Sequence, residues 1–110
     1  MVKDMKYEKP KERKVYNFDL DGTLTFNEPW WDVEPKVNEV MKKYLIDIFE
    51  KGHVIIIWTA RNWEYAPETV GWLIKNRIPY HGIMMGKGGA DYYIDDKATN
   101  AITLTKRLQQ

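Results

Sequence analysis

Val54-Ile55-Ile56-Ile57-Trp58 is the longest unbroken apolar run in this chain of 110 residues. Every position is apolar, whereas a strand with one face in water alternates apolar and polar residues. The run therefore predicts a buried strand of a parallel sheet, with helices covering both of its faces. Five residues are too few to cross a bilayer, so we expect no membrane span.

Helical and strand patterns flank this run on both sides. Upstream, apolar residues recur at helical spacing, with Pro35 suited to the first turn and Gly52 to the C-terminal stop. Downstream, the spacing predicts helices over 67–76 and 101–109. Shorter apolar segments predict three further strands, at residues 15–20, 83–85 and 92–95. The order strand, helix, strand, helix, strand, strand favours a small three-layer α/β fold with right-handed crossovers.

Composition limits the classes of protein that this chain can form. With 44% apolar residues it can bury one core, and we expect a single domain over residues 15–110 after a basic, flexible lead-in at 1–14. The net charge of +1 favours neither nucleic acid nor a membrane surface as a partner of the whole chain. The chain has no cysteine, which excludes disulfides and thiolate chemistry. We expect a cytoplasmic protein.

Polar side chains terminate all four predicted strands. They are Asp19 and Asp21 after the first strand, Thr59 after the second, Lys87 in the segment after the third, and Asp95 with Asp96 after the fourth. Ligands of an open parallel sheet bind beyond the carboxyl ends of its strands, so these side chains should meet at one edge. The sequence therefore predicts a functional site there.

These groups suit phosphoryl transfer through a covalent intermediate. A carboxylate attacks phosphorus only if the repulsion between two anions is neutralised, and a metal and a lysine supply that neutralisation. The carboxylates of Asp19 and Asp95 and a backbone carbonyl near Asp21 are oxygen ligands of the kind that suits Mg²⁺. Asp21, two residues beyond Asp19 on an extended chain, could protonate the leaving group and then activate water. Thr59 and Lys87 would hold the phosphate oxygens.

The ordered motifs resemble those of the haloacid dehalogenase (HAD) superfamily over residues 15–100. The resemblance implies a Rossmann-like HAD core with a small, mostly parallel sheet, and a Mg²⁺-dependent phosphatase. It implies that Asp19 is the nucleophile and Asp21 the general acid and base. Thr59 and Lys87 become the phosphate-binding pair, and the metal ligands come from Asp19, Asp21, Asp95 and Asp96.

A narrower resemblance is to small HAD proteins described as capsule-biosynthesis or sugar phosphatases of bacteria and phages. The residues that carry it are Trp58-Thr59-Ala60-Arg61, Gly86-Lys87, Ala90-Asp91 and the stretch 93–98. Most HAD phosphatases insert a cap domain after the first motif or between the second and third. The gaps at 25–34 and 62–86 leave no room for one, so a homo-oligomer could complete the site.

Three further side chains have open interpretations. Arg61 follows Thr59 and either contacts the substrate or lies in a solvated loop. Trp30 and Trp31 stack on a sugar or base, pack against a partner, or belong to the core.

The leading hypothesis is a phosphomonoester hydrolase that uses an aspartyl-phosphate intermediate and acts on a sugar phosphate or similar phosphorylated small molecule. An alternative substrate class is a nucleotide or a polynucleotide 3′-phosphate, recognised by the lysine-rich lead-in and the paired tryptophans, although nucleic acid is the less favoured partner. A different class of function is a non-catalytic binding module that keeps the HAD fold.

Overall fold

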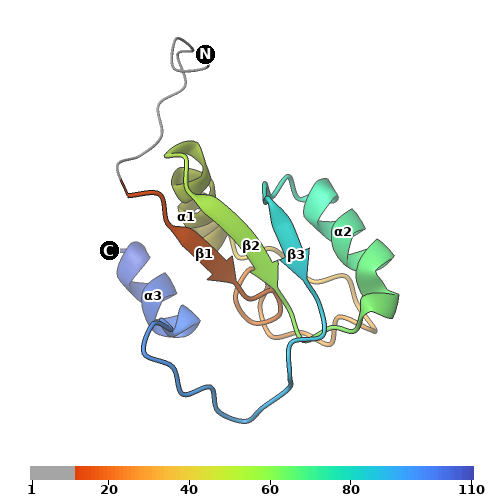
Figure 1. Cartoon of the computed structure of the whole chain (residues 1–110). Coiled ribbons are helices and arrows are strands. Elements are labelled where there is room, and N and C mark those ends of the chain that lie inside the picture. Colours follow the sequence, from red (N-terminus) through yellow and green to blue (C-terminus); the bar gives the residue numbers. More distant parts are fainter. Residues whose placement is uncertain (1–11) are drawn as a thin grey trace, which may run out of the picture.

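Three parallel strands form one open sheet in the computed structural model, which describes residues 12–110 (Figure 1). The elements in chain order are β1 (Val15–Phe18), α1 (Glu39–Glu50), β2 (Val54–Trp58), the short 3-10 helix η2 (Trp63–Tyr65), α2 (Ala66–Lys75), β3 (Gly82–Met84) and α3 (Ala101–Leu108). The predicted helices at 67–76 and 101–109 and the central strand are therefore confirmed to within about one residue.

The sheet has β2 in the middle, paired in parallel with β1 on one side and β3 on the other. Val15 lies opposite Val54, and Ile57 lies opposite Ile83. The small Rossmann-like α/β core expected from the sequence is confirmed. Because the strands run in parallel, the loops that follow β1, β2 and β3 emerge at the same edge of the sheet.

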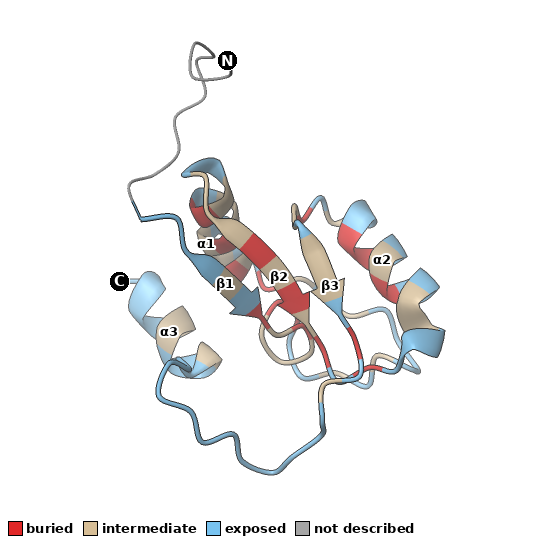
Figure 2. Ribbon diagram, viewed as in Figure 1, coloured by how far each residue is buried: buried red, intermediate tan, exposed pale blue. Residues whose placement is uncertain are grey.

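The hydrophobic core lies on one face of the sheet. Ile55 and Ile57 of β2 are fully buried, and they belong to one cluster with Leu45 of α1 and Leu73 of α2. Figure 2 shows this buried zone along β2 and on the inner sides of both helices. On the other face, Val54, Ile56 and Trp58 are only half-buried. The expectation that helices cover both faces of this strand therefore holds for one face.

Helix α1 begins later than its apolar spacing predicts. Pro35 was expected in the first turn, but the helix starts at Glu39 and is capped by Asn38, whose side chain accepts a hydrogen bond from the Met41 N–H. Val37 forms an isolated antiparallel bridge with Thr25 instead of a helical turn. The prediction for Pro35 is wrong because a contact with a distant segment holds the preceding backbone extended.

Both longer helices end in the same hydrogen-bonded cap. After α1, the Gly52 N–H donates to the Phe49 carbonyl and the His53 N–H to the Ile48 carbonyl, with Gly52 at φ 89°. This is the Schellman arrangement, which needs a left-handed residue, so the predicted role of Gly52 is confirmed. After α2 the residue in the left-handed conformation is Arg77, at φ 55°. A positive φ is unusual for any residue other than glycine.

The fourth predicted strand does not form. Residues 92–95 are irregular, and Figure 2 shows the segment between β3 and α3 as exposed along most of its length. Ile94 is 99% exposed, although its residue type favours burial. A segment forms a strand only when it pairs with the edge of a neighbouring strand. The apolar pattern of residues 92–95 indicates a preference for extended structure, but it does not provide such an edge.

The connections between the elements differ in length: residues 19–38 join β1 to α1 and residues 85–100 join β3 to α3, whereas only residues 51–53 join α1 to β2. The segment between β1 and α1 is mostly irregular, and η2 and α2 fill the segment between β2 and β3. Residues 1–11, most of the predicted basic lead-in, lie outside the described residues. Within residues 12–110, none of the helices combines the length and apolar character that a bilayer crossing requires.

Candidate active site

Asp19 is the first residue after β1 and lies at the carboxyl edge of the sheet. Its Oδ1 accepts a hydrogen bond of 2.8 Å from the Leu20 N–H, and its Oδ2 lies 3.7 Å from the Lys87 ammonium. The side chain is 40% exposed, so one oxygen can reach a ligand from solvent while the other is held. This is a suitable arrangement for a carboxylate nucleophile.

Burial raises the pKa of Asp19 above its usual value. The positive charge of Lys87 and the hydrogen bond from Leu20 lower it, and the nearby carboxylate of Asp21 raises it again. The raised pKa means that removal from water outweighs the attraction of the lysine. A partly desolvated carboxylate is also a stronger nucleophile than one fully surrounded by water.

The loop after Asp19 winds tightly around one carbonyl oxygen. The Leu20 carbonyl accepts hydrogen bonds from the N–H groups of Thr23, Leu24 and Thr25. Gly22 adopts φ 84°, which glycine reaches without steric cost. The buried Asn38 side chain donates to the Thr23 carbonyl, so the start of α1 holds this loop in place. These contacts fix the direction in which Asp19 and Asp21 leave the sheet.

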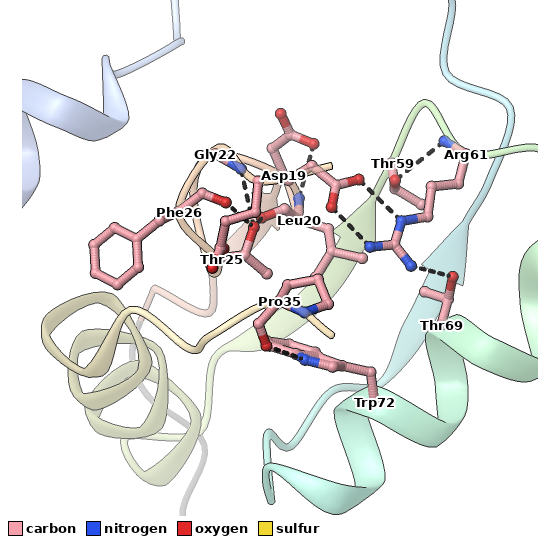
Figure 3. Close-up of polar contacts among 12 residues, drawn as sticks. Asp19, Leu20, Gly22, Thr25, Phe26, Pro35, Thr59, Arg61, Thr69 and Trp72 are labelled. Carbon is pink, nitrogen blue, oxygen red and sulfur yellow. Dashed lines mark hydrogen bonds and ion pairs between the residues drawn. The ribbon is translucent and has the colours of Figure 1, made fainter. Parts of the chain in front are cut away.

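Asp21 forms a bidentate ion pair with Arg61. Arg61 Nη2 lies 2.7 Å from one carboxylate oxygen of Asp21, and Nε lies 2.9 Å from the other. Arg61 Nη1 donates to the buried Thr69 hydroxyl of α2, at 3.1 Å (Figure 3). The guanidinium carbon also lies 4.1 Å from the centre of the Trp30 ring. Arg61 is 6% exposed, so the interpretation as a solvated loop residue is wrong.

The ion pair makes Arg61 a positioning residue for Asp21. Each carboxylate oxygen accepts one hydrogen bond from the guanidinium and keeps a second lone pair for a proton or a water molecule. The predicted contact of Arg61 with a substrate stays a prediction. Trp30 and Thr69 complete the surroundings of Arg61. Neither was assigned a place there from the sequence, because their contacts with Arg61 form only when the chain folds.

Lys87 lies in an aromatic enclosure beside Asp19. Its ammonium is 4.7 Å from the centre of the Trp58 ring and 4.4 Å from that of Tyr93, and the side chain is only 10% exposed. The Tyr93 hydroxyl donates to the Gly88 carbonyl, at 2.6 Å, which folds the loop back over the lysine. Two cation–π contacts and an ion pair therefore aim the ammonium at the site.

Thr59 and Lys87 are joined through the backbone. The Lys87 N–H donates to the Thr59 carbonyl, at 2.9 Å, and the Gly86 N–H donates to the Arg61 carbonyl, at 2.7 Å. The Thr59 hydroxyl is buried and accepts a hydrogen bond from the Arg61 N–H. The loops after β2 and β3 are thus linked to each other, as their position at one sheet edge predicts.

The structure does not bring Asp95 and Asp96 to this cluster. Both are exposed on the irregular segment that was expected to be a strand. The Lys97 N–H donates to Asp95 Oδ1, at 2.7 Å, and this hydrogen bond holds the pKa of Asp95 below its usual range. The sequence placed these two carboxylates at the site because it assumed a fourth strand, and that assumption is wrong.

Within the described part of the chain, the structure does not assemble the four predicted magnesium ligands into one group. Among residues 12–110, no group of three or more histidine, cysteine, aspartate or glutamate side chains could hold a metal ion. Asp21 is already paired with Arg61. What the structure assembles is a group of five residues from three loops: Asp19, Asp21, Thr59, Arg61 and Lys87.

Comparison with known proteins supports the fold. No family model matches this chain, and no curated protein matches it either. A crystal structure of an MCSG target from Vibrio cholerae is similar, with 29% identity, a TM-score of 0.66, and coverage of 87% of this chain and 94% of that chain.

Two structures of the Pnkp1/Rnl/Hen1 complex, one described as an RNA repair complex, are also similar. They are 22% and 20% identical over 94% and 93% of this chain, each with a TM-score of 0.60. This chain spans only 36% and 33% of those chains. The likenesses are compatible with the HAD-like fold that the motifs predict.

Proposed function

We propose that this protein is a phosphomonoester hydrolase of the HAD type and that Asp19 is its nucleophile. The observation that supports this best is the pairing of Asp19 Oδ2 with the enclosed Lys87 ammonium, at 3.7 Å. Lys87 can attract a phosphate oxygen and reduce the repulsion between the phosphate and the attacking carboxylate. The Leu20 N–H holds the other oxygen of Asp19, which leaves the carboxylate correctly oriented for attack.

The reaction would proceed in two steps. An oxygen of Asp19 forms a bond to phosphorus, the bond from phosphorus to the leaving oxygen breaks, and Asp21 gives a proton to that oxygen. A water molecule then loses a proton to Asp21 and attacks the phosphorus, which releases phosphate and restores Asp19. Arg61 would hold Asp21 in the orientation that both proton transfers require.

The charge balance of the five-residue group supports a requirement for a cation. With both carboxylates ionised, Asp19 and Asp21 carry two negative charges and Arg61 and Lys87 carry two positive charges, so the group is formally neutral. The proton that Asp21 gives in the first step would raise this total by only one. A phosphate monoester brings a charge of about −1.5 to −2 near pH 7. The Mg²⁺ requirement stays a prediction. Asp95 and Asp96, two of its four predicted ligands, would have to move to the sheet edge to join Asp19 and Asp21.

Two substrate classes are compatible with this proposal. The narrower family resemblance favours a sugar phosphate or a similar phosphorylated metabolite. The similarity to structures of the Pnkp1/Rnl/Hen1 RNA repair complex favours a phosphorylated nucleotide or polynucleotide end. Completion of the site by a second copy of the chain remains part of the proposal.

Phosphate release from a panel of phosphoesters tests the proposal. The panel contains p-nitrophenyl phosphate, sugar phosphates, nucleotides and a 3′-phosphorylated oligonucleotide, each with Mg²⁺ or EDTA. We expect turnover with Mg²⁺ that Asp19→Asn abolishes, whereas Asp47→Asn, an exposed substitution on α1, leaves it unchanged. Absence of turnover across the panel, with a folded protein, would favour a non-catalytic binding module.

A further inference from the structure

A cavity of about 460 Å³ lies beside the five-residue group. Residues 30–35 of the connection between β1 and α1 line one side, and Arg61, Tyr65 and the outer part of α2 line the other. Arg61 belongs both to the cavity wall and to the ion pair with Asp21. The cavity is therefore one side chain away from the carboxylate that we propose to protonate the leaving group. Its volume is within the range of small-molecule sites, about 300–1,000 Å³.

Four aromatic side chains form much of the cavity wall: Trp30, Trp31, Tyr65 and Trp72. The Trp30 ring lies edge-on to Tyr65, with the ring centres 5.0 Å apart, and edge-on to Trp31, at 5.7 Å. The Trp72 indole N–H donates to the Pro35 carbonyl, which ties α2 to the opposite wall (Figure 3). This hydrogen bond therefore links the two sides of the cavity.

Trp31 is the most solvent-exposed of these four aromatic residues. It is 68% exposed, and Trp30 contacts it edge-on, at an interplanar angle of 84°. A large aromatic ring left open to solvent at the wall of a cavity is typical of a ligand-binding surface. A flat ring stacked on Trp31 would cover this exposed surface.

The charges of the cavity disfavour an anion. The Arg61 guanidinium is engaged by Asp21 and Thr69, and Lys75 Nζ lies 2.8 Å from both carboxylate oxygens of Glu34. The other charged lining residues are Asp32 and Glu68, and both are acidic. Carboxylates accept hydrogen bonds and repel phosphate, so they favour a group that carries N–H or O–H donors over a second anionic group.

We propose that this cavity binds the nucleoside of a nucleoside monophosphate, with the base stacked on Trp31 and its amino group directed to Asp32 or Glu68. The phosphate of the same molecule would then reach Asp19. This inference rests on the proposed function, because it assigns the leaving group of that reaction. The acidic side chains of the cavity favour a base with an exocyclic amino group, such as adenine. They disfavour a second phosphate group nearby.

Binding of adenosine to the Asp19→Asn variant tests the cavity without catalysis. Isothermal titration calorimetry measures the Kd of adenosine and, in parallel, of ribose, which lacks the base. Trp31→Ala is the test substitution. Trp63→Ala is its matched control, because Trp63 is 61% exposed and does not line the cavity. Both residues lie at the surface, and circular dichroism checks that each variant is folded.

We expect adenosine to bind more tightly than ribose. Because stacking on one aromatic ring contributes a factor of about 5 to 150, Trp31→Ala should weaken adenosine binding at least fivefold. Trp63→Ala should change it less than twofold. Equal affinity for ribose and adenosine would overturn the proposal in favour of a sugar subsite, and equal effects of the two substitutions would overturn the role of Trp31.

The same measurements separate this inference from the proposed function. If the unsubstituted protein releases phosphate from p-nitrophenyl phosphate but does not bind adenosine, the cavity proposal is refuted and the hydrolase proposal stands. If adenosine binds through Trp31 but no phosphoester is hydrolysed, the nucleoside site stands and the hydrolase proposal is refuted.

Discussion

Replacing Arg61 with methionine should strongly destabilise the fold, because it removes one partner of a largely buried ion pair. The substitution keeps an unbranched chain of similar length but deletes the guanidinium. Asp21 then loses two charge-assisted hydrogen bonds, of 2.7 and 2.9 Å, and the fully buried Thr69 hydroxyl loses its partner. The loss therefore leaves polar groups without partners inside the protein.

The size of the effect follows from the burial of the two partners. Removing one member of a fully buried pair costs about 3–5 kcal/mol. The Arg61 side chain is 5% exposed, but that of Asp21 is 23% exposed and can regain part of its hydration. We therefore expect Arg61→Met to lower the free energy of unfolding by about 2–4 kcal/mol. Adding Asp21→Asn should recover part of this loss, because no carboxylate is then left unpaired.

Urea denaturation at neutral pH measures this difference, and a surface pair provides the control. Lys75 and Glu34 also lie 2.8 Å apart, but their side chains are 64% and 62% exposed. Lys75→Met should therefore cost at most about 1 kcal/mol. If Arg61→Met lowers the free energy of unfolding no more than Lys75→Met does, burial does not determine the strength of the Arg61 ion pair.

Three other substitutions test separate parts of the structure. Arg77→Gly should raise the free energy of unfolding by about 0.5–1 kcal/mol, because glycine adopts φ 55° without steric cost; thermal unfolding that shows no gain would contradict this. Asn38→Ala should lower the free energy of unfolding by about 1–3 kcal/mol, since this buried residue caps α1 and also donates to the Thr23 carbonyl. Urea unfolding should show a smaller loss for Asn100→Ala, because Asn100 is the exposed cap of α3. Burial raises the pKa of Asp19, so its contribution to stability is present below the unfolded-state pKa and is lost as the pH rises through the higher folded-state pKa. Thermal midpoints should therefore show Asp19→Asn gaining stability relative to the unsubstituted protein between pH 3 and pH 7, and an equal difference at both pH values would refute this.

Local sequence patterns predicted most of the regular structure. The apolar run at 54–58 predicted β2 and its place in a parallel sheet, and Gly52 marked the end of α1. Both features depend on residues that are close together in the chain. Apolar side chains at strand or helix spacing must be buried, and only glycine takes the left-handed conformation freely.

Contacts that form only when the chain folds explain the predictions that were wrong. The bridge between Thr25 and Val37 delays the start of α1. Residues 92–95 have the composition of a strand but no paired edge, and Tyr93 instead contacts Lys87 and Gly88. The pattern of a segment reports its preference for burial or extension, whereas pairing depends on which edge the rest of the chain places beside it.

The sequence alone determined which polar residues follow β1, β2 and β3, and therefore that Asp19, Thr59 and Lys87 belong to one sheet edge. Only the tertiary structure decided their partners: Arg61 against Asp21, Trp58 and Tyr93 around Lys87, and a cavity between two connections. The physical reason is the range of the interactions. Spacing and turn preferences act over a few residues, whereas most of these contacts join segments tens of residues apart, and all of them exist only after folding.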